Sequence, residues 1–162
     1  MTRFPLIRST GARGWGLPSG GFINVDLEIS APFDLRPLHS ALEPRLAVLV
    51  SSLGSRRSFI RAECLHPDPK GAAHAIITIA RVISRLRGRP RALWLASPHR
   101  VLDVGCSAGS SEVPFVELIG TPAVAAATRI GVQLAITVYR VDPEVLPAVR
   151  ASQLNRRKRG SA

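Results

Sequence analysis

Residues 121–139, TPAVAAATRIGVQLAITVY, carry the clearest secondary-structure signal in this chain of 162 residues. Thr121 is a common helix-capping residue and Pro122 suits the first turn of a helix. Gly131 is the residue type that most often follows the last turn of a helix. Side chains then alternate along residues 132–139 with the period of a strand. The stretch therefore predicts a helix that is followed directly by a strand.

Two further helices are expected towards the N-terminus. Residues 72–87 repeat apolar side chains at helical spacing, and Gly88 and Pro90 are expected to stop this helix. A shorter helix is expected over residues 35–43, with Asp34 as its N-cap. The apolar run 46–50 is expected to add one more helical turn, before a loop over residues 51–55.

The remaining segments read as strands. Residues 22–29 alternate cleanly, so that Ile23, Val25, Leu27 and Ile29 are expected on one buried face. Three other strands are expected over residues 59–65, 100–104 and 113–119. Together these elements predict the α+β class, in a single layered domain of about five strands with two to three helices packed on one face.

The formal net charge of +11 is concentrated in three places. Residues 1–21 carry three arginines and no acid, and residues 151–162 carry four basic residues and no acid. We therefore expect a flexible basic leader over 1–21, a single domain over 22–150 and a basic tail over 151–162. A transit peptide or a misassigned start stays open as an explanation of the leader.

The third concentration of charge is an arginine cluster that begins on the expected helix 72–87 and continues into the segment that follows it. Its members are Arg81, Arg85, Arg87, Arg89 and Arg91. Arginines that lie along one helix face and its exit loop would suit an acidic protein or a phosphate backbone. We predict that these residues bind a partner, and the alternative is a solvated face of an amphipathic helix.

The chain offers few signals for catalysis. The histidines show no metal-ligand spacing, so we expect no metal site and no catalytic residue. Cys64 and Cys106 are too few for a disulfide framework, although a single bridge between them stays open. Two unpaired, unreactive thiols are typical of a protein in the reducing cytoplasm. No apolar run in the sequence has the length of a membrane span.

Residues 101–109, VLDVGCSAG, resemble the first motif of class I S-adenosylmethionine methyltransferases. By that resemblance Asp103, Gly105 and Gly109 would line a cofactor loop. Ser107 stands where the motif has its central glycine, and only 53 residues follow Gly109. We therefore interpret the string as the end of a strand, expect no cofactor, and keep a divergent methyltransferase-like domain as an alternative function.

A second resemblance runs from Trp94 to Tyr139. It rests on the strand around Asp103, the helix 122–130 and the alternating strand that ends in Tyr139. This pattern is similar to the C-terminal half of small bacterial α+β proteins, some of which are immunity proteins encoded beside polymorphic toxins. The resemblance implies a non-catalytic inhibitor-type module that covers an acidic protein partner. A nucleic-acid or ribosome-associated protein that uses its basic ends is the remaining alternative.

Overall fold

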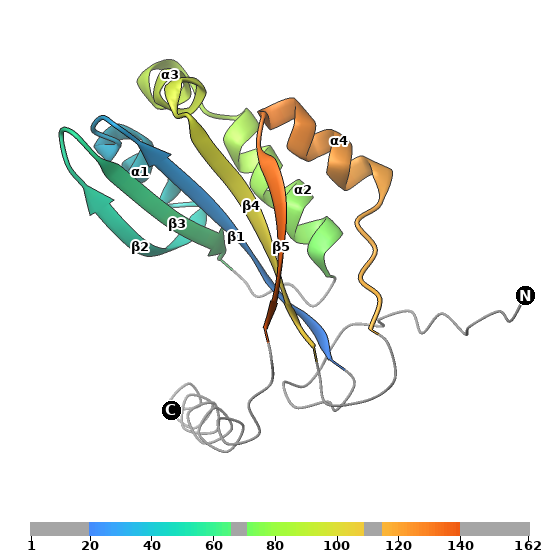
Figure 1. Ribbon diagram of the computed structural model, residues 1–162. Helices are drawn as coiled ribbons and strands as arrows, with labels where there is room; N and C mark the ends of the chain where they lie inside the picture. Colours follow the sequence, from blue (N-terminus) through green and yellow to red (C-terminus); the bar gives the residue numbers. More distant parts are fainter. Residues whose placement is uncertain (1–19, 66–70, 109–114, 140–162) are drawn as a thin grey trace, which may run out of the picture.

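The computed structural model describes residues 20–65, 71–108 and 115–139 (Figure 1). The elements follow in the order β1 (Gly21–Ala31), α1 (Arg36–Leu42), β2 (Leu46–Leu53), β3 (Ser58–Cys64), α2 (Ala72–Ser84), α3 (Gly88–Ala96), β4 (His99–Ser107), α4 (Thr121–Ile130) and β5 (Gln133–Tyr139). The predicted α+β class is confirmed. The predicted tail, nearly all of the predicted leader and residues 140–150 of the predicted domain lie outside the described residues.

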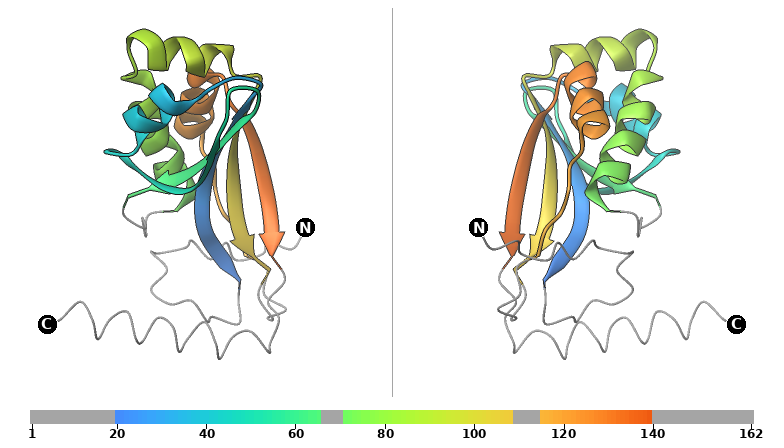
Figure 2. Two further views of the ribbon diagram at one scale, coloured as in Figure 1. Left: turned by 90° about the vertical axis from the view of Figure 1, so that its left-hand side faces the viewer. Right: turned by 90° about the vertical axis from the view of Figure 1, so that its right-hand side faces the viewer.

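The strands form one sheet in the order β2-β3-β1-β4-β5. β1 is central and pairs antiparallel with β3 and with β4, whereas β5 pairs parallel with β4. A parallel neighbour needs a crossover connection, and the segment that contains α4 provides it. The helices gather on one face of the sheet, as predicted (Figure 2). The other face has no helix of the described residues over it.

The hydrophobic core lies between the sheet and the helices. Leu27 and Ile29 of β1 are fully buried, and so are Ile76, Ile79 and Ile83 of α2. Burying each such side chain stabilises the fold by roughly 1.5–3 kcal/mol. The predicted apolar face of α2 is therefore confirmed, although the helix ends at Ser84, three residues earlier than predicted.

One predicted core residue of β1 lies on the wrong face. The pairing of β1 with β4 is irregular between Phe22 and Asn24, so Ile23 is an extra residue in the ladder. Phe22 packs against the core in its place, while Ile23 lies near Gly105 on the opposite face. A bulge of this kind reverses the alternation of the preceding residues, and the sequence pattern gives no sign of it.

The prediction for residues 46–55 was wrong. Instead of a helical turn and a loop, residues Leu46–Leu53 form β2, which pairs antiparallel with β3 around a tight turn at residues 54–57. The run Leu46–Val50 is too short to separate a helix from a strand by its period. Pairing with β3 decides its conformation, because β3 would otherwise be left with an unpaired edge.

Two further corrections concern residues 88–96 and 113–119. Gly88 and Pro90 do follow the end of α2, but they also begin α3, because a proline is tolerated in the first turn of a helix. Residues 115–119 are described and form no strand, while residues 113 and 114 lie outside the described residues. The predicted helix near residue 121 is confirmed, but its N-cap is Gly120 and not Thr121, which is the first helical residue. Gly131 ends the helix in the left-handed conformation with φ of 71°.

Candidate functional site

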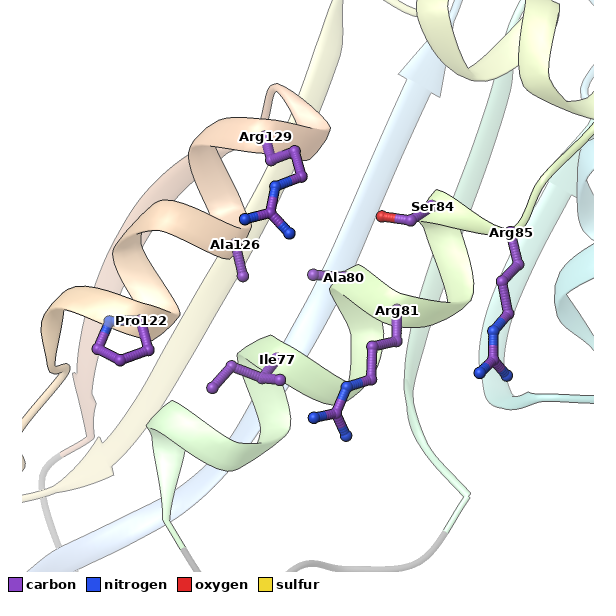
Figure 3. Close-up of a pocket in the computed structure, with 8 residues that line it drawn as sticks. All are labelled: Ile77, Ala80, Arg81, Ser84, Arg85, Pro122, Ala126 and Arg129. Carbon is purple, nitrogen blue, oxygen red and sulfur yellow. The ribbon is translucent and has the colours of Figure 1, made fainter.

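A groove of about 420 Å³ lies between α2 and α4 (Figure 3). Its floor is apolar and is made by Ile77, Ala80 and Ala126. The small side chains of Ala80 and Ala126 allow the two helices to approach closely, and this leaves a shallow depression between longer side chains. The rim of the groove carries polar residues from both sides: Arg81 and Ser84 from α2, Arg85 from its C-cap, and Arg129 from α4.

The groove is strongly basic. In Figure 3 the guanidinium group of Arg129 reaches from α4 towards α2, Arg81 extends from the last turn of α2, and Arg85 extends from the residue after the helix, on the side of α2 away from α4. Among residues 20–65, 71–108 and 115–139, no carboxylate is ion-paired with any of these three arginines. No ion pair within these segments neutralises their positive charges. Arg81 and Arg129 also lie in the last turns of their helices, where the helix dipole favours a cation.

The predicted arginine cluster does not form one continuous face. Arg87 donates two hydrogen bonds of 2.9 Å to the carbonyl oxygens of Ser84 and Leu86, and so covers the end of α2. Arg89 and Arg91 belong to α3 instead of an exit loop. The pKa of the Asp34 carboxyl group is lowered, chiefly by the hydrogen bond from the backbone N–H of Arg36. The positive charge of Arg89 makes the smallest contribution to this shift.

The structure thus separates the five predicted binding residues into two that line the groove and three that lie apart from it. Arg129 joins the groove although the sequence analysis did not select it. The sequence does place Arg129 in the last turn of the predicted helix 122–130. Nothing in the sequence, however, indicates that α4 packs beside α2.

The uncovered face of the sheet holds a second polar cluster. Asp26 lies directly opposite Asp103 across the β1–β4 pair, and Glu28 lies opposite Arg61 across the β1–β3 pair. Arg61 donates a hydrogen bond to Glu28, and this contact raises the pKa of Arg61. Burial raises the pKa of Asp26; Arg61 opposes this effect, while Glu63, Glu28 and Asp103 add to it. This acidic cluster is held together around one arginine.

The methyltransferase-like string does not form a cofactor loop in the described residues. Asp103 and Gly105 lie inside β4, which runs on to Ser107, and Gly109 lies outside the described residues. The two carboxylate oxygens of Asp103 are 2.9 and 2.8 Å from the hydroxyl of Thr137 on β5. A Cβ atom at Gly105 would lie 2.5 Å from Oδ1 of Asn24, so glycine allows this side chain to pack closely against β4. Residues 101–107 of the string thus belong to a strand.

Glu117 has a structural role that the sequence analysis missed. Its Oε1 accepts a hydrogen bond of 2.8 Å from the backbone N–H of Ala72, the first residue of α2. A carboxylate at this position satisfies an N–H group that the helix itself leaves unpaired, and it interacts favourably with the helix dipole. Because Ala72 and Glu117 are 45 residues apart, no sequence motif around either residue predicts this contact.

The cysteines do not form a disulfide with each other. Cys106 is buried, and its burial raises the pKa of its thiol, with Glu117 and Asp103 adding to the shift. A raised pKa keeps the thiol protonated and so reduces its nucleophilicity. In the part of the chain that the structure describes, no three His, Cys, Asp or Glu side chains gather so as to hold a metal ion.

The same described segments contain no helix that is long and apolar enough to cross a membrane. In comparisons with known proteins, no family model matches this chain, and neither a curated protein nor a solved structure matches it.

Proposed function

We propose that this protein is a non-catalytic binding module of the inhibitor or immunity type, which docks an acidic protein partner on the groove between α2 and α4. One observation carries the proposal. Three arginines that form no ion pair with the carboxylates of the described residues, Arg81, Arg85 and Arg129, line an apolar floor that two separate helices build.

The geometry favours an amphipathic acidic helix as the docked segment. Arg81 lies in the last turn of α2 and Arg85 is its C-cap residue, four positions later, so they match two carboxylates that are one turn apart on a partner helix. Arginine binds carboxylates through paired hydrogen bonds, which adds geometric selectivity to charge attraction. The floor of Ile77, Ala80 and Ala126 supplies contact for apolar side chains of the same segment.

The same floor favours a protein partner over nucleic acid. A phosphate backbone would use the arginines but would leave the apolar floor without a partner, since double-stranded nucleic acid presents phosphates and sugars at its surface. In addition, aromatic residues make up only 5% of the chain, which provides little surface for the stacking of single-stranded bases.

A peptide titration tests the proposal with the full-length chain. The probe is a synthetic helical peptide of about five turns that carries Glu residues one turn apart beside a stripe of Leu. We expect the double variant Arg81→Glu/Arg85→Glu to weaken binding of this peptide at least about tenfold, measured by fluorescence anisotropy. Arg56→Glu/Arg57→Glu is the matched control, because both arginines are exposed in the β2–β3 turn and the change in charge is the same.

Two comparisons make the result decisive. A peptide of the same composition in scrambled order keeps the charge but loses the amphipathic pattern, and we expect it to bind more weakly. A short DNA duplex serves as a polyanion without apolar side chains. Equal losses of peptide binding in both arginine double variants, or a loss of duplex binding in Arg81→Glu/Arg85→Glu larger than its loss of peptide binding, would reject the groove as a protein-docking site.

A further inference from the structure

β5 is an edge strand with an exposed apolar surface. In the described residues it pairs only with β4, and no strand lies on its other side. Ile136 and Val138 are 65% and 61% exposed, and Leu134 is exposed as well. These three residues align with Leu102, Val104 and Cys106 of β4, so they lie on the helix-covered face of the sheet. The apolar stripe of β5 thus extends the core face of the sheet beyond the helices.

The strand lacks the features that usually prevent edge pairing. Its sequence from Gln133 to Tyr139 contains no charged residue and no proline, and its register with β4 is continuous over seven residues. Monomeric proteins normally protect such an edge with charges, prolines or a bulge. The opposite edge strand, β2, has such a bulge, since its register with β3 shifts between Val48 and Val50.

The hydrogen-bonding groups of β5 fix which residues face outward. The carbonyl oxygen of Tyr139 accepts a hydrogen bond from Ala108 on the side of β4. Successive residues of a strand point their N–H and C=O groups to opposite edges. Leu134, Ile136 and Val138 therefore direct their backbone groups away from β4, and they also carry the exposed apolar side chains.

We propose that β5 pairs antiparallel with β5 of a second copy of this chain, around a two-fold axis at Ile136. Ile136 then faces Ile136 of the other copy, and Leu134 faces its Val138, so both sheets join into one. All outward N–H and C=O groups of these residues find partners, and the two apolar stripes become continuous on the same face.

A second copy suits this edge better than a foreign strand. Antiparallel pairing around a two-fold axis is self-complementary, because the same residues are used on both sides. No charge is brought close to its own copy, since charged residues are absent between Arg129 and Arg140. On the opposite face of the sheet Ala135 meets Thr137 and Gln133 meets Tyr139, and neither pair is a like-charge pair.

The oligomeric state of the full-length chain tests this proposal by sedimentation velocity over a series of concentrations. We expect a monomer–dimer equilibrium for the native chain and a monomer for Ile136→Arg. Ile136→Pro removes the outward N–H group at the two-fold axis and should also give a monomer, because a proline is tolerated on an edge strand. Val50→Arg is the matched control at the other edge, where the side chain is 52% exposed, and should leave the dimer unchanged.

Cysteine cross-linking then tests the register. Opposed residues of a hydrogen-bonded antiparallel pair have Cα atoms about 5.5 Å apart, which a disulfide can span. Ile136→Cys should give a covalent dimer under mild oxidation, whereas Leu134→Cys, which faces Val138 of the other copy, and the native chain should not. A chain that stays monomeric at all concentrations, or a dimer that survives both Ile136→Arg and Ile136→Pro, would overturn the proposal.

Discussion

At the scale of single residues, the ionised carboxylate of Asp26 destabilises the folded state. Its pKa lies above the ordinary value because burial and the neighbouring carboxylates Glu63, Glu28 and Asp103 outweigh Arg61. A raised pKa means that the folded state holds the proton more tightly than the unfolded chain does. The ionised form of Asp26 therefore destabilises the fold as the pH rises above its unfolded pKa.

We predict that Asp26→Asn raises the free energy of unfolding near about pH 7 by roughly 0.2–1 kcal/mol, since it removes a carboxylate whose ionised form is disfavoured first by burial and then by Glu63, Glu28 and Asp103. The gain should fall towards zero near about pH 3, where Asp26 is protonated in both states. Urea titrations at the two pH values measure it. Asp34→Asn is the control and should lose stability near neutral pH, because the pKa of Asp34 is lowered. An equal gain from Asp26→Asn at both pH values would contradict the electrostatic explanation.

The sequence indicates where residues contact their neighbours in the chain, as at the ends of helices. It does not indicate contacts between residues that are far apart in the sequence. The role of Gly131 at the end of α4 followed from its place after a helical pattern. Asp34 was predicted as the N-cap of α1; the structure places Leu35 there, and Asp34 accepts a hydrogen bond of 2.9 Å from the N–H of Arg36. Glu117 stabilises the start of α2 from 45 residues away, and no local rule identifies such a contact.

At the scale of elements, α3 is held by Trp94. This side chain is fully buried, and its Nε1–H donates a hydrogen bond of 3.1 Å to the carbonyl oxygen of Ile130 at the end of α4. The guanidinium group of Arg100 lies 5.5 Å from the ring, where a cation–π contact adds to the packing. Trp94 therefore connects α3, β4 and the end of α4 that carries Arg129.

We predict that Trp94→Phe lowers the free energy of unfolding by about 1–3 kcal/mol, because it leaves the carbonyl of Ile130 without its partner and a space beside it. Urea titration measures the loss. Leu95→Ala on the same helix is the control: that side chain is 56% exposed, so we expect a change within about 0.5 kcal/mol. Similar losses in both variants would contradict the assignment of the loss to the docking of Trp94.

Periodicity predicted the elements that have one apolar face, and it failed where no such face exists. β1, β3 and α2 each alternate between more buried and less buried residues in their own period, whereas β5 alternates in sequence although none of its residues is buried. By contrast, α3 buries only Trp94 fully, and β2 is exposed over half of its length, so neither has a strong pattern. The groove depends on α2 and α4 lying side by side, which is a property of the sheet order and not of either helix sequence.

At the scale of the whole molecule, the net charge of +11 does not describe either proposed surface. The groove between α2 and α4 carries three arginines that pair with no carboxylate of the described residues, the uncovered sheet face is acidic around Arg61, and β5 carries no charge. Attraction at the groove and association at β5 therefore have different physical origins. Salt separates them, because it screens charges but does not weaken the burial of apolar surface.

We predict that the two interactions respond to salt in opposite directions. The screening length falls from about 10 Å at 0.1 M salt to about 3 Å at 1 M salt, so the acidic peptide should bind the groove more weakly at the higher concentration. Dimerisation through β5 should become tighter, because two copies that each carry +11 repel each other less. Peptide anisotropy and sedimentation velocity at both salt concentrations, with Arg81→Glu/Arg85→Glu and Ile136→Arg as the respective controls, measure the two responses. If both interactions weakened together, and Ile136→Arg also reduced peptide binding, a single surface would have to serve both, and the assignment of separate sites to the groove and to β5 would be wrong.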